Sequence, residues 1–216
     1  MNGVDAGLIA AWLAARSMVR DLPAPVPDHG GWRVDTGQPA EIRRHVFAAA
    51  CPGLIELGAT VTEPLVLLKL AAPHAELAAL LPPRWRLEPL AHVMTFIGNF
   101  GDGSKLALPE GYRLSVERDG DRALARIAAP GGTIAASGHA AERDGAFIYD
   151  RIATEAAHRR RGLGRALMLA LQRTRRSPGA RQVLTATADG RALYASLGWT
   201  VHCPWSTAAI SCSTPS

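Results

Sequence analysis

The stretch Arg159-Arg160-Arg161-Gly162-Leu163-Gly164 decides how this chain is interpreted. It follows a strand-like run, Ala146–Thr154, and it precedes residues 165–171, which are apolar except for Arg165 and whose composition predicts a helix. Glycine permits backbone conformations that a Cβ forbids, and the first turn of a helix offers unpaired N–H groups at its positive end. Together with three arginines, this order predicts a site for a ligand that carries more than one phosphate.

The R-x-x-G-x-G spacing separates this loop from two common nucleotide-binding loops. A P-loop needs GxxxxGK[ST], which the sequence lacks, and a dinucleotide fingerprint needs GxGxxG near the start of a βαβ unit. Between His158 and Arg181 the chain carries eight arginines and no acidic residue. This local charge favours a polyanionic cofactor, with a solvated arginine-rich surface as the alternative. No aromatic residues are interleaved to stack bases, so no nucleic-acid partner is expected.

Composition predicts a soluble globular protein. The chain has 216 residues, of which 48% are hydrophobic and 20% charged, and its net charge is +5. Its three cysteines have no metal-binding spacing and its seven histidines are scattered, so we expect no metal and reduced thiols in the cytoplasm. Residues 7–15 are apolar but too short for a membrane span. Leu8, Trp12, Ala15 and Val19 lie at helical spacing and predict a docked helix, with a homodimer contact as an open alternative.

The rest of the chain divides into two parts with different patterns. From Tyr112 onward, alternating segments separated by glycine turns predict four antiparallel strands that lead into the arginine loop. Before them, residues 32–35, 64–70 and 93–97 are predicted to be strands, and residues 39–50 and 73–81 helices. We expect a helix and linker over residues 1–30, an α/β subdomain over 31–100, a linker over 101–111 and a second domain over 112–216. The order of elements predicts an α+β fold.

Two blocks of the second domain resemble the GCN5-related N-acetyltransferase (GNAT) superfamily. The first spans residues 152–167 and includes the arginine loop. The second, Arg191-Ala192-Leu193-Tyr194-Ala195-Ser196-Leu197-Gly198-Trp199, is similar to the family signature A-x-x-L-Y-x-x-x-G-F/W. The resemblance implies a mixed, mostly antiparallel twisted sheet flanked by helices. It also implies an acyltransferase that uses acetyl-CoA as co-substrate, without a metal.

The resemblance also implies roles for particular residues. Tyr194 would protonate the leaving thiolate, and the pantetheine arm would lie along a splayed or bulged strand. The cofactor-binding residues would be Ile152, Ala153, Thr154, Arg159, Arg160, Arg161, Gly162, Leu163 and Gly164. The acceptor is expected to be a small amine that attacks directly in a ternary complex. A protein or peptide N-acetyltransferase and a non-catalytic acetyl-CoA sensor are the alternatives.

Two features depart from the family pattern. The turn from Arg118 to Ala123 leaves no room for the helices that usually shape the acceptor pocket, so the first 110 or so residues must supply that wall. We expect their strand–helix–strand–helix pattern to form a degenerate copy of the same fold, in a tandem arrangement. Residues 183–187 contain no carboxylate to act as a general base. Asp150, Glu142, Glu155 and His139 are other candidates, and alternation places Asp150 on one face with Ile148 and Ile152.

Overall fold

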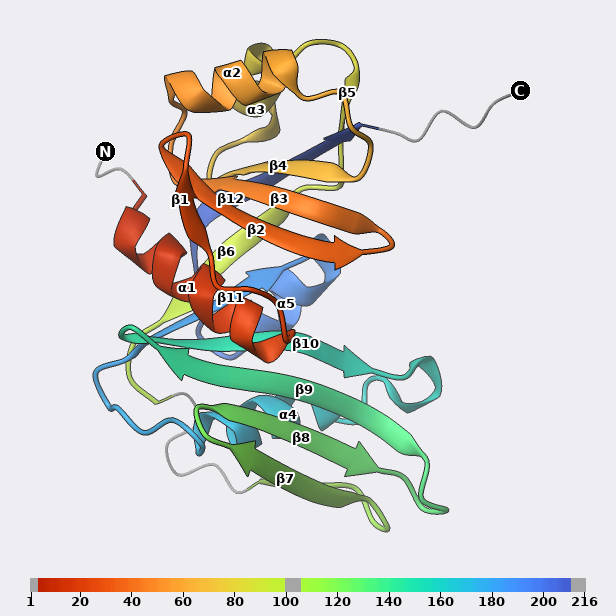
Figure 1. Cartoon of the computed structure of the whole chain (residues 1–216). Coiled ribbons are helices and arrows are strands. Elements are labelled where there is room, and N and C mark those ends of the chain that lie inside the picture. Colours follow the sequence, from red (N-terminus) through yellow and green to blue (C-terminus); the bar gives the residue numbers. More distant parts are fainter. Residues whose placement is uncertain (1–3, 100–105, 211–216) are drawn as a thin grey trace.

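One continuous, twisted sheet organises the chain, and helices cover both of its faces (Figure 1). The computed structural model describes residues 4–99 and 106–210. Its strands are β1 (Val26–Asp28), β2 (Gly31–Gln38), β3 (Glu41–Phe47), β4 (Val66–Leu70), β5 (Trp85–Leu87), β6 (Ala91–Phe96), β7 (Arg113–Asp119), β8 (Arg122–Ala128), β9 (Ile134–Arg143), β10 (Ala146–Thr154), β11 (Arg181–Ala186) and β12 (Thr200–Ile210). The helices are α1 (Ala6–Val19), α2 (Pro52–Thr60), α3 (His74–Leu80), α4 (Leu163–Gln172) and α5 (Ala188–Ser196), with a 3₁₀ turn, η1, at Ala156–His158.

The strand order is β1-β2-β3-β4-β12-β6-β11-β10-β9-β8-β7, and β5 pairs with β12 beside this path. Two strand pairs are parallel, β3 with β4 and β10 with β11, and the remaining pairs are antiparallel. A helix connects the strands of each parallel pair, α2 in the first and α4 in the second. The predicted α+β fold with a mixed, mostly antiparallel sheet is therefore confirmed.

The two halves of the chain exchange strands. Strand β6, from the N-terminal half, lies between β11 and β12. Strand β12 in turn pairs with β6 over its first half and with β4 and β5 over its second half. The N-terminal half has the order β3, α2, β4, α3, and the C-terminal half has the matching order β10, α4, β11, α5. In each half a strand of the other half lies beside the second parallel strand, β12 beside β4 and β6 beside β11. This repeat agrees with the expected degenerate copy of the fold in the N-terminal half.

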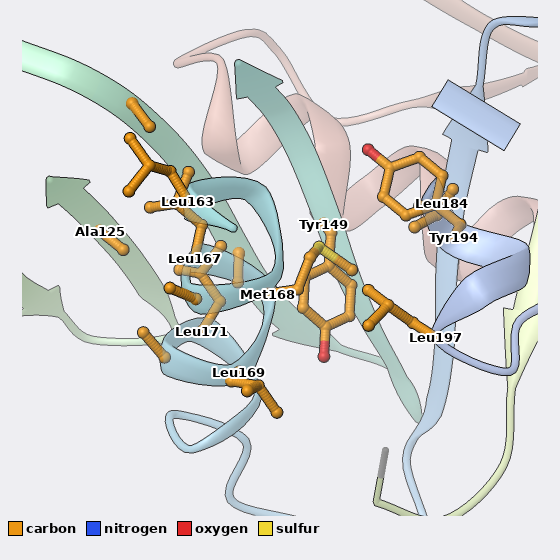
Figure 2. Packing of buried hydrophobic residues seen from close by; sticks show 14 of the residues in the cluster. Ala125, Tyr149, Leu163, Leu167, Met168, Leu169, Leu171, Leu184, Tyr194 and Leu197 are labelled. Atoms are coloured by element: carbon orange, nitrogen blue, oxygen red, sulfur yellow. The ribbon is translucent and has the colours of Figure 1, made fainter. Parts of the chain in front are cut away.

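Helices on opposite faces of β9 and β10 bury two separate cores. On one face α1 contacts both strands, and its Leu8, Trp12, Ala15 and Val19 are all buried, as the helical spacing predicts. On the other face α4 packs its leucines against a cluster that includes Ala125 of β8 (Figure 2). A third cluster lies under α2 and α3. The sheet continues from one half of the chain to the other, and α1 lies between its two parts (Figure 1).

The helix predicted over residues 39–50 is wrong, because most of this segment is strand β3. Val46 packs in the cluster under α1, whereas its neighbour Phe47 packs in the cluster under α2 and α3. Such burial of successive residues on opposite faces requires a strand. The helix is α2, which starts at Pro52, a residue favoured in the first turn. In the predicted linker 101–111, residues 101–105 lie outside the described residues.

Candidate active site

A cleft opens where the parallel strands β10 and β11 separate. Their pairing runs from Ala146 with Arg181 to Tyr149 with Leu184 and then ends, although both strands continue. The cleft has a volume of about 560 Å³. It brings together most of the predicted cofactor-binding residues and Tyr194, and it is lined by Ile152, Ala153, Thr154, Arg159, Arg160, Gly162, Leu163, Gly164, Arg165, Thr187, Asp189, Gly190, Leu193 and Tyr194.

A β-bulge shapes the β10 wall of this cleft. The register between β10 and β9 shifts between Asp150 and Ala153, and Arg151 has a left-handed backbone with φ of 53°. A bulge leaves an unpaired residue and re-aims the side chains beyond it. Beyond Tyr149 no pairing with β11 occupies the backbone of β10, so peptide groups face the cleft. The splayed or bulged strand that the resemblance implies is therefore present.

The bulge also changes which face Ile152 occupies. Ile148 packs in the cluster under α1, whereas Ile152 packs against the cluster around α4. A Cβ built on Gly138 would lie 2.4 Å from Ile152 Cδ1 and 3.3 Å from Leu171 Cδ1. The expectation that Asp150, Ile148 and Ile152 share one face is therefore wrong for Ile152. Simple alternation fails because the extra residue resets the period of two.

The arginine loop ends in a helix N-terminus without a side-chain cap. Arg160 and Gly162 have φ of 58° and 79°, and Gly162 is the N-cap of α4 with no side-chain hydrogen bond. Left-handed residues in such a turn can form a concave set of N–H groups that binds anions. The N–H groups of the first helical turn have no partner within the helix. The loop and the start of α4 therefore offer amide donors and a positive dipole end to the cleft.

The side chains of the three loop arginines line two different cavities. Arg159 and Arg160 line the cleft, and the Arg159 Nε also donates to the carbonyl oxygen of Thr154 at 3.2 Å. Arg161 instead lines a neighbouring cavity of about 340 Å³, together with Ala107, Leu108 and Pro109. Arg165 lines both spaces. Positive charge is thus distributed over both sides of the loop.

Tyr194 of α5 lines the cleft, and its side chain is packed against buried residues. It is 7% exposed, and its ring lies 6.3 Å from the Trp199 ring, centroid to centroid. Figure 2 shows it beside Leu184 at the edge of the buried cluster. Burial, and secondarily the charge of Asp150, raises the pKa of Tyr194 to about 12. The phenol therefore stays protonated at neutral pH and can donate a proton or a hydrogen bond.

The candidates for a general base have different surroundings. Asp150 accepts two hydrogen bonds from Arg20, at 2.6 and 2.9 Å. Although burial alone would raise its pKa, Arg20 and the charge of Arg16 lower it overall, so Asp150 is a weak base. Glu142 accepts from the backbone N–H groups of residues 176 and 177, which is a structural role. His139 pairs opposite Asp150, and burial followed by the charge of Arg151 lowers its pKa. Glu155 is exposed.

Several residues of the site were not identified from the sequence. Thr187, Asp189, Gly190 and Leu193 line the cleft because α5 begins where β11 ends. Their position just before Tyr194 was the available signal. In the described part of the chain, no three metal-binding side chains come close enough to hold an ion. No helix there has the length and apolar run needed to cross a bilayer.

The comparisons with known proteins relate this fold and the cleft to those of acetyltransferases. Residues 114–201 match the family model of the acetyltransferase (GNAT) domain. The matched stretch contains every residue that lines the cleft. No curated protein matches it significantly.

Solved structures share this fold at low sequence identity. A GCN5-related N-acetyltransferase from Kribbella flavida is 14% identical, with a TM-score of 0.65 over 99% of this chain and 98% of the other. A GCN5-related N-acetyltransferase-like protein from Streptococcus suis is 13% identical, with a TM-score of 0.57 over 84% of each chain. A GCN5-related N-acetyltransferase from Sphaerobacter thermophilus is 12% identical, with a TM-score of 0.54 over 83% and 76%. The Kribbella match includes the N-terminal half, so the strand arrangement of that half is shared as well.

Proposed function

We propose that the protein transfers the acetyl group of acetyl-CoA to the amine of a small molecule by direct attack in a ternary complex. The observation that carries this proposal is the cleft between β10 and β11. One wall offers free strand backbone, one end offers the loop amides and arginines, and the opposite wall presents Tyr194. These are the groups that a thioester linked to a pyrophosphate would need.

The donor would be held mainly by backbone. N–H groups from Gly162 to Arg165 would bind the pyrophosphate, with Arg159 and Arg160 supplying charge. The pantetheine arm would lie along Ile152–Thr154 and pair with it as an added strand. Arg161 would reach a phosphate on the far side of the loop, since it lines the neighbouring cavity. The side chains of Leu163 and Ile152 would contribute to packing while their backbones face the donor.

The transfer itself needs a proton donor and a polarised carbonyl. The amine nitrogen would attack the thioester carbon, the C–S bond would break, and the thiolate would take the proton of Tyr194. A peptide N–H at the bulge of β10 would stabilise the developing oxyanion. The proton released by the amine would restore the phenol or pass to water. We also propose that residues 112–216 hold the donor and that residues 31–100 form much of the acceptor wall.

Substitution of Tyr194 tests the catalytic part of this proposal. Tyr194→Phe keeps the ring and its packing against Trp199 but removes the proton. We expect kcat for thiol release to fall about 100-fold or more, while the Kd for acetyl-CoA stays within about twofold. Arg33→Gln, in an exposed ion pair on β2, is the control. If the wild-type protein bound acetyl-CoA but acetylated no amine in a broad panel, the non-catalytic sensor would replace this proposal.

A further inference from the structure

A group of charged side chains is buried where the two halves meet beside α1. Its members come from four separate elements, and we call it the junction cluster: Arg16 and Arg20 of α1, Glu41 and Arg44 of β3, Lys69 of β4 and Asp150 of β10. The side chains of Arg44 and Asp150 are 3% and 8% exposed, and Lys69 is 8% exposed. The cluster therefore places four cations and two carboxylates largely out of water.

Both carboxylates of the junction cluster are already engaged. Asp150 receives two hydrogen bonds from Arg20, and Glu41 receives two from Arg44, both at 2.6 Å. Bidentate pairs of this kind use the fork of donors on one edge of a guanidinium. They leave Arg16 with only a 3.7 Å ion pair to the shared Asp150, and in the part of the chain that the structure describes Lys69 has no carboxylate within ion-pair distance.

Arg16 and Lys69 are poorly compensated among the described residues. The Arg16 Nε is buried, lies 3.7 Å from Asp150 Oδ1 and makes no hydrogen bond. Its guanidinium lies 5.3 Å above the Trp12 ring, which orients it. Lys69 Nζ donates to the hydroxyl of Thr207 at 3.3 Å. Isolated buried charge is strongly unfavourable unless a partner neutralises it.

The charges act on one another at close range. Burial is the main cause that lowers the pKa of Arg16 to about 9; the charges of Arg44 and Arg20 lower it further, and those of Asp150 and Glu41 oppose the shift. Burial also lowers the pKa of Lys69 to about 8, with the charges of Arg16 and Arg44 adding to the effect. Glu41 and the exposed Glu88 oppose this shift of Lys69. Even so, an additional anion would relieve the repulsion among the cations.

The junction cluster adjoins the reactive end of the donor cleft. Asp150 is the last residue of β10 before the bulge, and the next residues line the cleft. Its charge also acts on Tyr194, which lines the opposite wall. An acceptor whose amine lay at the bulge would therefore lie next to Asp150, whose Oδ1 is 3.7 Å from the Arg16 Nε.

We propose that the acceptor is an amine that also carries a carboxylate, and that Arg16 and Lys69 bind this carboxylate. The proposal rests on the proposed acetyltransferase function and adds the acceptor class to it. A carboxylate is planar and singly charged, which suits a guanidinium and a nearby ammonium group. Polycationic amines would be repelled by the same cluster, and amines without a carboxylate would leave its charge uncompensated.

Matched acceptors test the proposal on the unmodified protein. The assay measures CoA thiol release with a panel of amino acids, each beside its carboxamide and its decarboxylated amine. The two analogues lack the carboxylate, and their amines are less basic and more basic than that of the amino acid, so basicity alone cannot explain a preference for the acid. We expect kcat/KM to favour the amino acid over both analogues by roughly 10- to 100-fold, as for a charge-assisted hydrogen bond. Equal or greater activity with the analogues that lack the carboxylate, or with aminoalkyl phosphates, would overturn the assignment.

Two variants connect the preference to the junction cluster. Arg16→Gln and Lys69→Met should each raise KM for the amino acid about tenfold and leave the Kd for acetyl-CoA within twofold, whereas Arg33→Gln changes neither. Thermal unfolding of each variant shows whether it folds. A second test uses the wild type alone: we expect the amino acid to raise its Tm and the carboxamide to leave its Tm unchanged. If both variants kept the preference for the acid, the cluster would not bind it. Failure of the wild type to bind acetyl-CoA would instead overturn the proposed function itself.

Discussion

Replacement of Gly162 tests whether the loop backbone has the conformation on which the donor site depends. Gly162 has φ of 79° and caps α4, and a Cβ built on it would meet nothing within 4 Å. An alanine side chain at position 162 would therefore cause no clash. Its cost would come from the left-handed backbone conformation, which a residue with a Cβ adopts unfavourably. A left-handed residue with a Cβ costs about 1–2 kcal/mol. For a chain of this size, that corresponds to a decrease in Tm of roughly 2–8 °C.

The same substitution should weaken donor binding more than it weakens the fold. If alanine turned φ of Gly162 negative, the first N–H groups of α4 would no longer point into the cleft, and one lost charge-assisted hydrogen bond amounts to about 1.5–3 kcal/mol. We expect Kd for acetyl-CoA, measured by isothermal titration calorimetry, to rise by one to two orders of magnitude. Gly162→Asn should be milder in both measurements, because asparagine tolerates left-handed φ. Gly179→Ala is the matched control, since its Cβ also meets nothing and its φ is not left-handed. Equal values for the alanine, asparagine and control variants would refute the argument.

Two further substitutions test the packing and the ion pairs. In Gly31→Ala the new Cβ would lie 2.4 Å from the Val46 carbonyl oxygen and 2.7 Å from Phe47 Cδ1, so we expect a loss of roughly 1–3 kcal/mol in chemical denaturation, and an unchanged midpoint would contradict the close approach of β2 and β3. Asp150→Asn removes the carboxylate that pairs with Arg20 and should destabilise the fold by about 3 kcal/mol at neutral pH. The pKa of Asp150 is lower in the folded state than in the unfolded chain, where it is about 3.9. The ionised carboxylate therefore contributes fully to the free energy of unfolding above about pH 3.9, and this contribution is lost as the pH falls through the folded-state pKa. The difference between wild type and Asp150→Asn should therefore shrink in unfolding measurements as the pH falls below 4, and a difference that grew would be inconsistent with this pair.

Local patterns in the sequence predicted the donor half of the fold well. The turns at Gly120 and Gly145 both have left-handed φ, so their glycines carried a usable signal. The loop and Tyr194 lie on one cleft because a strand, a helix and a second parallel strand bring them together. Such a unit is local in sequence, and its glycines and apolar periods are visible without tertiary context.

Features that depend on distant contacts could not be predicted in the same way. Strand β3 was predicted as a helix because two of its apolar residues, the neighbours Val46 and Phe47, pack in two different cores. The exchange of β6 and β12 between the halves cannot be predicted from local sequence, because each segment has only the pattern of an extended strand and nothing in it indicates its partner. The junction cluster unites α1 with β3, β4 and β10, and Arg16 looks like an ordinary surface arginine of a helix until α1 is placed in the angle of the sheet.

A crystal structure of the protein with acetyl-CoA bound would test the central claim most directly. We predict pyrophosphate oxygens within hydrogen-bond distance of the N–H groups from Gly162 to Arg165, and a pantetheine arm alongside Ile152–Thr154. The thioester would then lie between the bulge of β10 and the hydroxyl of Tyr194. Binding of acetyl-CoA elsewhere on the protein, with the cleft between β10 and β11 empty, would contradict the account.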